Sequence, residues 1–171
     1  MTRPAAAAFA SLHRWMLGVD ERVWGWLAPL TVALIGGGLR FWRLDRPDRL
    51  VFDETYYVKD AAAYLERGHE RALRPGLTGA EADRLWSAGT TDVWGTAPNF
   101  VVHPPGGKWM IALGELLFGT TSPWGWRFAS AVAGTLSILL IGRIARRLFG
   151  STLLGTTAAL LLAVDGQHFV H

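Results

Sequence analysis

Two short polar motifs stand out in a chain that is half hydrophobic. The first is Asp53-Glu54, within VFDETYYVKDA, which follows the first long apolar segment. The second is the His-Pro-Pro turn of VHPPGGKW, which contains His103 and Lys108 and precedes two further apolar segments. A carboxylate can accept a proton, and cationic side chains can stabilise an anion. Because both motifs border apolar segments, we expect an enzyme that works at the boundary between water and lipid.

The composition indicates an integral membrane protein. Of the 171 residues, 50% are hydrophobic, 18% are charged and nine are tryptophan, which fits a membrane protein better than a soluble domain. The net charge of +3 does not indicate nucleic-acid binding, because the arginines lie at the edges of apolar runs and no basic run alternates with aromatic residues. The absence of cysteine excludes disulfides and thiolate metal sites.

Three segments without charged residues predict membrane-spanning helices. They are residues 23–39, 128–142 and 148–164. Each is shorter than the ~20 residues that cross the hydrocarbon core, and flanking tryptophans and arginines extend it into the interface. The expected segments are a cytoplasmic N-terminal segment (1–22), a first transmembrane helix (23–42), an outer loop (43–126), a second transmembrane helix (127–144) and a third (148–171).

The arginines between the second and third spans predict the orientation. GRIARRLFG places Arg143, Arg146 and Arg147 in one tight loop, and short arginine-rich loops stay in the cytoplasm. The N-terminus is then inside and the outer loop outside. One face of the membrane would therefore carry Asp53, Glu54, His103, Lys108, Arg127, Asp165 and His168.

The outer loop is predicted to contain two interfacial helices. The first covers about 54–67, with Asp53 as its N-cap and Gly68 after its end. Its aromatic face would lie on the bilayer and consists of Tyr56, Tyr57 and Tyr64. Residues 76–99 read as a loop with one helical turn at 80–85. The second helix covers about 107–118 and is interrupted by Glu115.

Each polar residue of these motifs also has a purely structural explanation. Aspartate is a preferred N-cap, so Asp53 can cap a helix whether or not it is catalytic. Glu54 would be favoured by the helix dipole, and the prolines after His103 suit a rigid helix start. Arg127 can extend its guanidinium to the interface from the edge of a span.

Asp165 and His168 lie three residues apart near the end of the third span. A metal site needs at least one more ligand, and none is in sight. We therefore expect polar contacts at the outer mouth of the bundle and no metal.

The order of these motifs resembles the N-terminal part of the protein O-mannosyltransferases. The resemblance rests on FDE after the first span, HPPGGKW at the start of a short helix, WRFASAVAG at the start of the second span and AVDGQHFVH at the end of the third. It covers roughly residues 20–171, and the composition is most similar to the actinobacterial branch. One departure is Gly106, where the family usually has a larger apolar residue.

The resemblance implies an all-α integral membrane protein, the N-terminal part of a multi-span glycosyltransferase C-type fold with a large outer loop. It implies transfer of mannose from polyprenyl-phosphate mannose to Ser/Thr hydroxyls of secreted proteins, at the extracytoplasmic side of the plasma membrane. Membrane lipid is a partner, and no cofactor, metal or nucleic acid is expected. We expect this chain to be inactive without the remainder of such an enzyme.

The chemistry of this transfer needs one carboxylate, because a phosphate leaves readily as an anion. Asp53 is the candidate base of an inverting transfer, and Glu54 orients it or the acceptor. The candidate donor-phosphate ligands are Arg127, Lys108 and His103, with weaker support for Lys59. The residues expected to shape the acceptor site are Tyr56, Tyr57, Pro104, Pro105 and Asp165.

Two other classes of function stay open at this point. One is a different transferase that uses a lipid-phosphate sugar, such as an arabinose type. The other is a non-enzymatic transport or assembly subunit. Transporters place ionisable residues near the middle of the bilayer, whereas all three expected spans lack charges between their ends.

Overall fold

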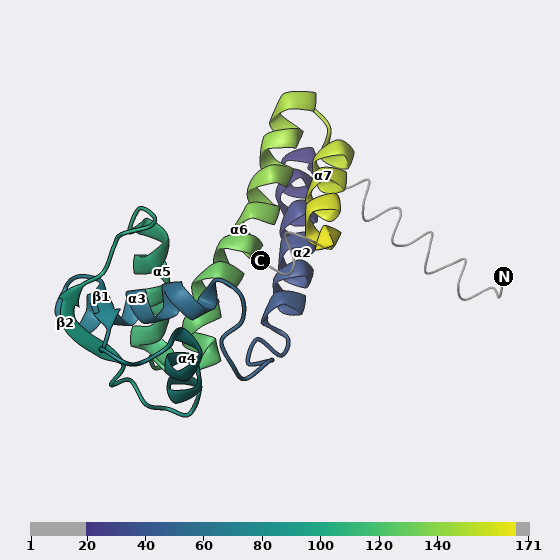
Figure 1. The fold of residues 1–171 in the computed structure, drawn as a ribbon. Coiled ribbons are helices and arrows are strands. Elements are labelled where there is room, and N and C mark those ends of the chain that lie inside the picture. The colour runs from purple at the N-terminus through teal and green to yellow at the C-terminus, as the bar shows by residue number, and fades with distance from the viewer. Residues whose placement is uncertain (1–19, 167–171) are drawn as a thin grey trace, which may run out of the picture. The chain divides into compact units, whose positions relative to one another are not determined.

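The computed structural model describes residues 20–166, which form two compact units. The helical unit contains the described residues up to 38 and from 134, and the mixed unit contains residues 39–133. Within the described residues the fold is mostly helical, with six helices and one small sheet (Figure 1). Helix α6 (Pro123–Phe149) begins in the mixed unit and ends in the helical unit.

The helical unit packs α2 (Glu21–Phe41) and α7 (Thr152–Val164) against the second half of α6. Its core is small and consists of Ala33, Ile138, Ala159 and Ala163. Glycines allow the helices to approach closely. A Cβ added at Gly142 would lie 2.9 Å from the Pro29 Cβ and 3.0 Å from the Ala159 Cβ. Close approach through small residues is typical of helix packing in membranes.

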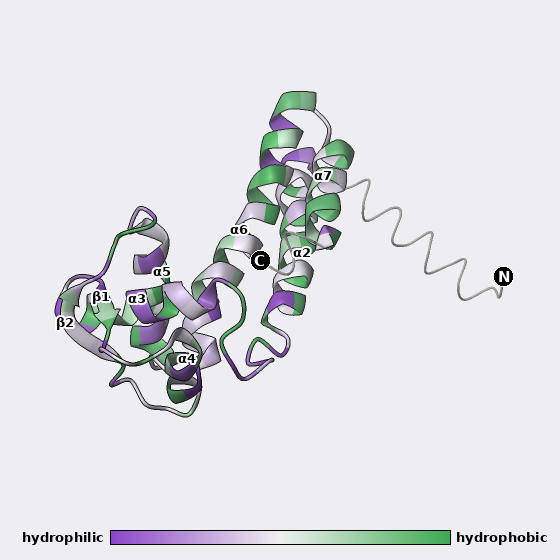
Figure 2. Ribbon diagram, viewed as in Figure 1, coloured by the Kyte–Doolittle hydropathy of each residue, from purple (hydrophilic) through white to green (hydrophobic). Residues whose placement is uncertain are grey.

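The outer surface of the helical unit is apolar. Figure 2 shows hydrophobic residues along α7 and most of this part of α6. The exposed large side chains include Leu34, Ile35, Leu140, Leu153 and Leu161. Such an exposed apolar surface is suited to contact with membrane lipid. Of the described helices, only α6 is both long and apolar enough to cross a membrane, judged by length and composition, and α7 is a shorter apolar helix.

The predicted arginine-rich loop is wrong in detail. Arg143, Arg146 and Arg147 lie on α6, and the connection to α7 is only Gly150 and Ser151. Gly150 adopts a φ of +62°, a conformation that glycine tolerates, and the Ser151 hydroxyl accepts a hydrogen bond from the Leu154 N–H at 3.3 Å. The error arose because the charged residues from Arg143 onward were taken to lie beyond the end of the helix, whereas α6 continues to Phe149.

These arginines bind to the start of α2. The Arg143 guanidinium lies 3.6 Å from the centroid of the Trp26 ring and donates to the Gly25 carbonyl. Arg146 donates to the Glu21 carbonyl at 2.9 Å. Arginines near the end of a span count toward orientation as those in a loop do, so the predicted orientation does not depend on the corrected detail.

The mixed unit contains α3 (Glu54–Arg67), β1 (Arg71–Leu73), α4 (Gly79–Ser87), β2 (Trp94–Pro98), α5 (Gly106–Phe118) and the first part of α6. Its core consists of Leu50, Val58, Ala62, Ala82, Trp86, Val93 and Trp126. The indole N–H groups of Trp86 and Trp126 both donate to the Thr120 carbonyl, at 3.0 and 2.7 Å. The connection between α5 and α6 is thereby fixed to this core.

The prediction for residues 76–99 is confirmed in part, because the helical turn expected at 80–85 is present as α4, but the segment also contains β2. The described chain is mostly helical, with one small sheet that was not predicted. Helix α4 begins with a capping box, in which Thr78 and Glu81 bond to each other's backbone N–H groups. Strand β2 then pairs antiparallel with β1. The sequence analysis predicted neither of the two strands.

Helix α5 is not interrupted by Glu115, contrary to the prediction. The side chain is 1% exposed, and neither carboxyl oxygen has a hydrogen-bond partner among the described residues. Burial, with a smaller effect of the Glu66 charge, raises the pKa of Glu115 to about 9. The group is therefore protonated and uncharged at neutral pH, which allows it to lie inside the helix packing.

The predicted exposed face of three tyrosines on α3 is also wrong. Only Tyr56 is exposed, at 69%. Tyr57 contacts His103, and the Tyr64 hydroxyl donates to Glu70 at 3.0 Å. Residues 58–63 of α3 are all buried, so α3 lies within the mixed unit instead of resting on its surface.

The close helix approach in the helical unit can be tested with a glycine pair. We expect Gly142→Ala to lower the free energy of unfolding by about 1–3 kcal/mol, because the new Cβ overlaps its neighbours. Gly38→Ala is the control, since no atom lies within 4 Å of its added Cβ, and it should be neutral or stabilising. Unfolding in detergent micelles measures both, and equal effects would contradict the packing.

Candidate functional site

The candidate site begins at the turn before α3. Phe52 has a φ of +53°, a left-handed conformation that aromatic residues rarely adopt, and it directs the chain into the helix. Asp53 occupies the N-cap position, and its carbonyl accepts from the N–H groups of Tyr56 and Tyr57 at 3.0 and 3.1 Å. Its side chain, however, makes no capping hydrogen bond and is exposed. The carboxylate that sequence analysis explained as a cap does not act as one.

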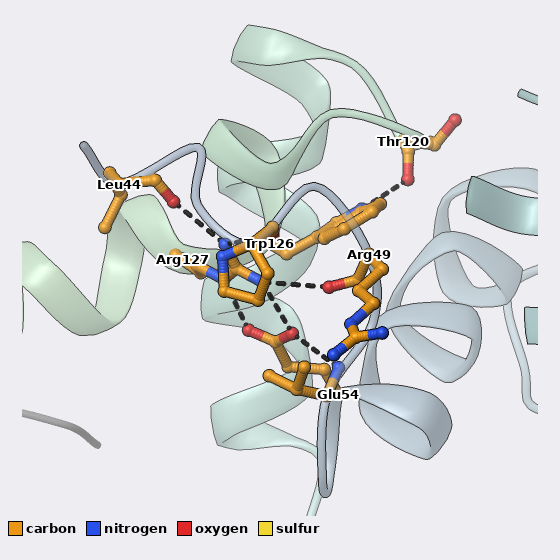
Figure 3. Close-up of polar contacts among 8 residues, drawn as sticks. Leu44, Arg49, Glu54, Thr120, Trp126 and Arg127 are labelled. Carbon is orange, nitrogen blue, oxygen red and sulfur yellow. Dashed lines mark hydrogen bonds and ion pairs between the residues drawn. The ribbon is translucent and has the colours of Figure 1, made fainter. Parts of the chain in front are cut away.

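Glu54, the adjacent carboxylate, is held from two sides. Its Oε1 accepts from Arg127 Nε at 2.6 Å, and its Oε2 accepts from Arg127 Nη2 at 2.9 Å (Figure 3). The same Oε2 accepts from the Val51 N–H at 3.0 Å. Two neighbouring carboxylates therefore differ sharply, since one is fixed by a bidentate ion pair and the other is exposed.

Arg127 uses every N–H group that it has. Besides the two bonds to Glu54, Nη1 donates to the carbonyls of Leu44 and Pro47, each at 3.0 Å, and Nη2 donates to the Arg49 carbonyl at 3.1 Å. Figure 3 shows these bonds converging on one guanidinium, which joins α6 to the start of α3 and to the segment before it. A guanidinium has five N–H donors, and all five are occupied.

This geometry bears on the role predicted for Arg127. A guanidinium with five protein acceptors has no free donor for a phosphate unless some of these bonds break. Phosphate binding by Arg127 stays a prediction, and the described contacts favour a positioning role. The sequence around Arg127 gives no sign of this positioning role, because the hydrogen-bond partners of Arg127 lie far from it along the chain.

The His-Pro-Pro motif lies at the start of α5. Pro105 occupies the N-cap position, and the exposed His103 ring meets the Tyr57 ring edge-on, with 5.6 Å between the centroids. Sequence analysis had not linked these two residues to each other. Gly106, the departure from the family pattern, has no atom within 4 Å of an added Cβ, so no described neighbour requires glycine there.

Lys108 is buried, with 2% of its surface exposed. Its Nζ lies 2.6 Å from Glu70 Oε1 and 3.0 Å from Asp60 Oδ2. Burial alone lowers the pKa of Lys108, but the hydrogen bonds and charges of Glu70 and Asp60 outweigh it and raise the pKa. Lys108 is therefore a charged group inside the protein, in contact with two carboxylates that sequence analysis did not select.

Two further candidate residues, Lys59 and Asp165, lie elsewhere in the structure. Lys59 is also buried, and it bonds to Asp83 of α4 and to the Thr55 carbonyl. Asp165 follows the last residue of α7 in the helical unit, whereas the other candidates belong to the mixed unit. His168 lies outside the described residues.

The anchoring role of Arg127 can be tested without any substrate. Arg127→Lys keeps the charge but cannot reproduce the paired bonds, so several acceptors lose their donors. We expect the free energy of unfolding to fall by about 1–3 kcal/mol. Arg49→Lys is the matched control, because only the Arg49 carbonyl takes part in this network. Equal stability of both variants, measured by thermal unfolding in micelles, would contradict the anchor.

One protein family and several known proteins are similar to this chain. The sequence model of the family described as dolichyl-phosphate-mannose-protein mannosyltransferase matches residues 102–170. A polyprenol-phosphate-mannose protein mannosyltransferase of Mycolicibacterium smegmatis is 36% identical over 157 residues, which is 90% of this chain and 26% of that protein. The protein of the same name from Mycobacterium tuberculosis is 33% identical over 90% of this chain and 26% of its own length. The one from Corynebacterium glutamicum is 39% identical over 68% of this chain and 19% of its own length.

A shorter similarity extends to an undecaprenyl phosphate-alpha-4-amino-4-deoxy-L-arabinose arabinosyl transferase of Pseudomonas aeruginosa. It is 46% identical over 63 residues, which is 37% of this chain and 11% of that protein. No solved structure matches the chain. The chain spans about a quarter of the length of the mycobacterial relatives. With relatives of one name over nine-tenths of its length, the chain belongs to the dolichyl-phosphate-mannose-protein mannosyltransferase family.

Proposed function

We propose that this chain forms part of an inverting mannosyltransferase, which moves mannose from polyprenyl-phosphate mannose to Ser/Thr hydroxyls of secreted proteins. The names of the mycobacterial and corynebacterial relatives support the donor and the protein acceptor. The exposed Asp53 carboxylate, beside a Glu54 that is fixed by Arg127, is the observation that carries the proposal.

In the proposed reaction Asp53 accepts the proton of the acceptor hydroxyl. The hydroxyl oxygen forms a bond to the anomeric carbon of mannose, and the bond from that carbon to the phosphate oxygen breaks. The products are the O-mannosylated residue and polyprenyl phosphate, which carries away the negative charge. A single displacement of this kind inverts the anomeric centre and needs one base, because the phosphate leaves without a proton donor.

The two carboxylates have different roles in this proposal. A general base must be able to reach its proton, and the Asp53 side chain is exposed and makes no capping hydrogen bond within the described residues. Glu54 cannot approach a substrate without leaving Arg127. We therefore assign Glu54 and Arg127 to positioning, since together they hold the turn that presents Asp53.

The donor phosphate would approach from the side of His103. This ring is exposed, whereas the ammonium groups of Lys108 and Lys59 are buried in ion pairs. Tyr57 and the prolines at 104 and 105 hold His103 and shape its surroundings. Tyr56, which is 69% exposed, is available to an acceptor.

The proposed setting is a multi-pass protein of the plasma membrane with this site on the extracytoplasmic face. The length of α6 and the apolar exterior of the helical unit support membrane insertion. Helix α5 presents an apolar stripe of exposed side chains, which suits an interfacial helix. This stripe consists of Trp109, Met110, Leu113, Leu116 and Leu117.

Mannose is favoured over an arabinose-type sugar by the extent of the similarity. The arabinosyl transferase matches 37% of the chain, and the mycobacterial mannosyltransferases match 90%. In the complete natural polypeptide, transfer from polyprenyl-phosphate mannose but not from the aminoarabinose donor would support this choice.

Substitution of Asp53 tests the proposed base. We expect Asp53→Asn in the complete natural polypeptide to lower mannosyl transfer by about 10²-fold or more, because the amide cannot accept the proton. Thermal stability should not change, since the described Asp53 side chain makes no capping bond. Asp48→Asn, an exposed aspartate of the preceding segment, should retain activity. Full transfer by Asp53→Asn to an acceptor peptide would exclude Asp53 as the base.

Cysteine labelling tests the proposed orientation, since the chain has no cysteine of its own. We expect Ser87→Cys, at the exposed end of α4, to react with an impermeant maleimide on intact cells. Phe149→Cys, at the exposed end of α6, should react only after the membrane is opened. The opposite labelling pattern would reverse the proposed topology.

A further inference from the structure

The segment 100–107 carries His103 and leads into α5, which begins at Gly106. Before that residue the segment has no regular structure, and it exposes its apolar side chains. Phe100 is 81% exposed, Val101 53% and Val102 64%. Such a segment has few contacts of its own to define its course. Its two ends, however, are both bound to Glu70.

The first end of the segment is Asn99. The Asn99 N–H donates to the Glu70 carbonyl at 3.1 Å. Phe100 continues from this point, with its N–H bonded to Asn99 Oδ1 at 3.0 Å.

The second end of the segment is Lys108, in the first turn of α5. Its Nζ bonds to Glu70 Oε1 at 2.6 Å and to Asp60 Oδ2 at 3.0 Å. Glu70 is itself held by the Tyr64 hydroxyl at 3.0 Å. Asp60, Glu70 and Lys108 are exposed by 8%, 2% and 2%, so water competes little for these bonds.

The middle of the segment touches the same group through an aromatic ring. Lys108 Nζ lies 5.7 Å from the Tyr57 ring centroid, within the range of a cation–π contact. The His103 ring packs on that tyrosine at 5.6 Å. Tyr57 lies in the first turn of α3, the turn that follows Asp53.

We propose that Asp60, Glu70 and Lys108 form a clamp that holds the segment 100–107 at both ends and thereby keeps His103 beside the first turn of α3. The three are positioning residues, because they are buried and act through Tyr57 and His103. The significance of the clamp for catalysis rests on the proposed function, whereas its existence does not.

An ionic clamp selects its partner residues more strictly than an apolar contact does. Buried ion pairs add little net stability, but they accept only partners with the right charge and geometry, and breaking one leaves a costly unpaired charge. Two carboxylates share one ammonium here. Loss of Lys108 would therefore leave both carboxylates without this cation and release the second end of the segment, so that only the backbone bond of Asn99 to Glu70 holds it.

A spin label tests the clamp directly, because the chain has no cysteine. We expect a nitroxide on Val101→Cys, read by continuous-wave EPR in nanodiscs, to become at least about twofold more mobile when Lys108→Met is added. Lys59→Met is the matched control. It removes an equally buried lysine of the same unit that pairs with α4 instead, and it should leave the label unchanged.

A second pair of variants avoids the unpaired charges that Lys108→Met leaves. Tyr57→Leu keeps the clamp ions and removes the ring that contacts both His103 and Lys108 Nζ, so it should mobilise the label while circular dichroism stays unchanged. Tyr56→Leu, on the exposed neighbour, should have no effect. An immobile label in both Lys108→Met and Tyr57→Leu would overturn the clamp, and so would equal mobilisation by the two control variants.

These measurements need no substrate, so they separate the clamp from the proposed function. If the label responds as expected while Asp53→Asn retains mannosyl transfer, the clamp stands and the proposed base fails. If Asp53→Asn abolishes transfer while the label ignores Lys108→Met and Tyr57→Leu, the base stands and the clamp fails.

Discussion

The ion pair between Glu54 and Arg127 is the contact on which the rest of the mixed unit depends. It joins α6 to the first residue of α3, and the same guanidinium holds three carbonyls of the segment between 44 and 49. A lysine could not do this, because only a planar group with five donors can meet a carboxylate edge and three carbonyls at once. Without this contact the turn at Phe52 and Asp53 would be joined to the protein only along the chain and through α3. The strained φ of Phe52 is tolerable because its surroundings are held in this way.

In the mixed unit, cationic side chains mainly form ion pairs that hold parts of the structure together. Lys108 binds two carboxylates, Lys59 binds Asp83, and Arg127 binds Glu54. Each of these cations would be a plausible phosphate ligand if it were exposed. The structure instead leaves Asp53 and His103 accessible and encloses the groups around them. Preorganisation of this kind suits the proposed site, in which one base must stay in place, because a group that is already oriented needs no rearrangement as a reaction proceeds.

The two units reach stability by different means. In the helical unit, glycine and alanine bring helices close and the large apolar side chains face outward, which is favourable only where lipid replaces water. In the mixed unit, tryptophans and valines fill a core and buried ions join its elements. Glu115 is also buried in the mixed unit, but among the described residues neither of its carboxyl oxygens has a hydrogen-bond partner, and its raised pKa keeps it neutral. Burial thus selects the charge state of each polar group according to whether a partner is within reach.

The sequence by itself determined the elements that depend on local pattern. Helix α3 begins and ends where its acidic first residue and Gly68 predict, α5 starts one residue before the predicted position, and the motif order indicated the family. The capping box of Thr78 and Glu81 was also present as a local signal for α4, where the sequence predicted a helical turn at 80–85. Only the tertiary structure decided which carboxylate is free, which cations are enclosed, and that β1 pairs with β2. Those outcomes depend on contacts between residues far apart in the chain, such as Glu54 with Arg127 and Glu70 with Lys108. Residue type shows that two groups are able to pair, and packing decides which pairs come within bonding distance.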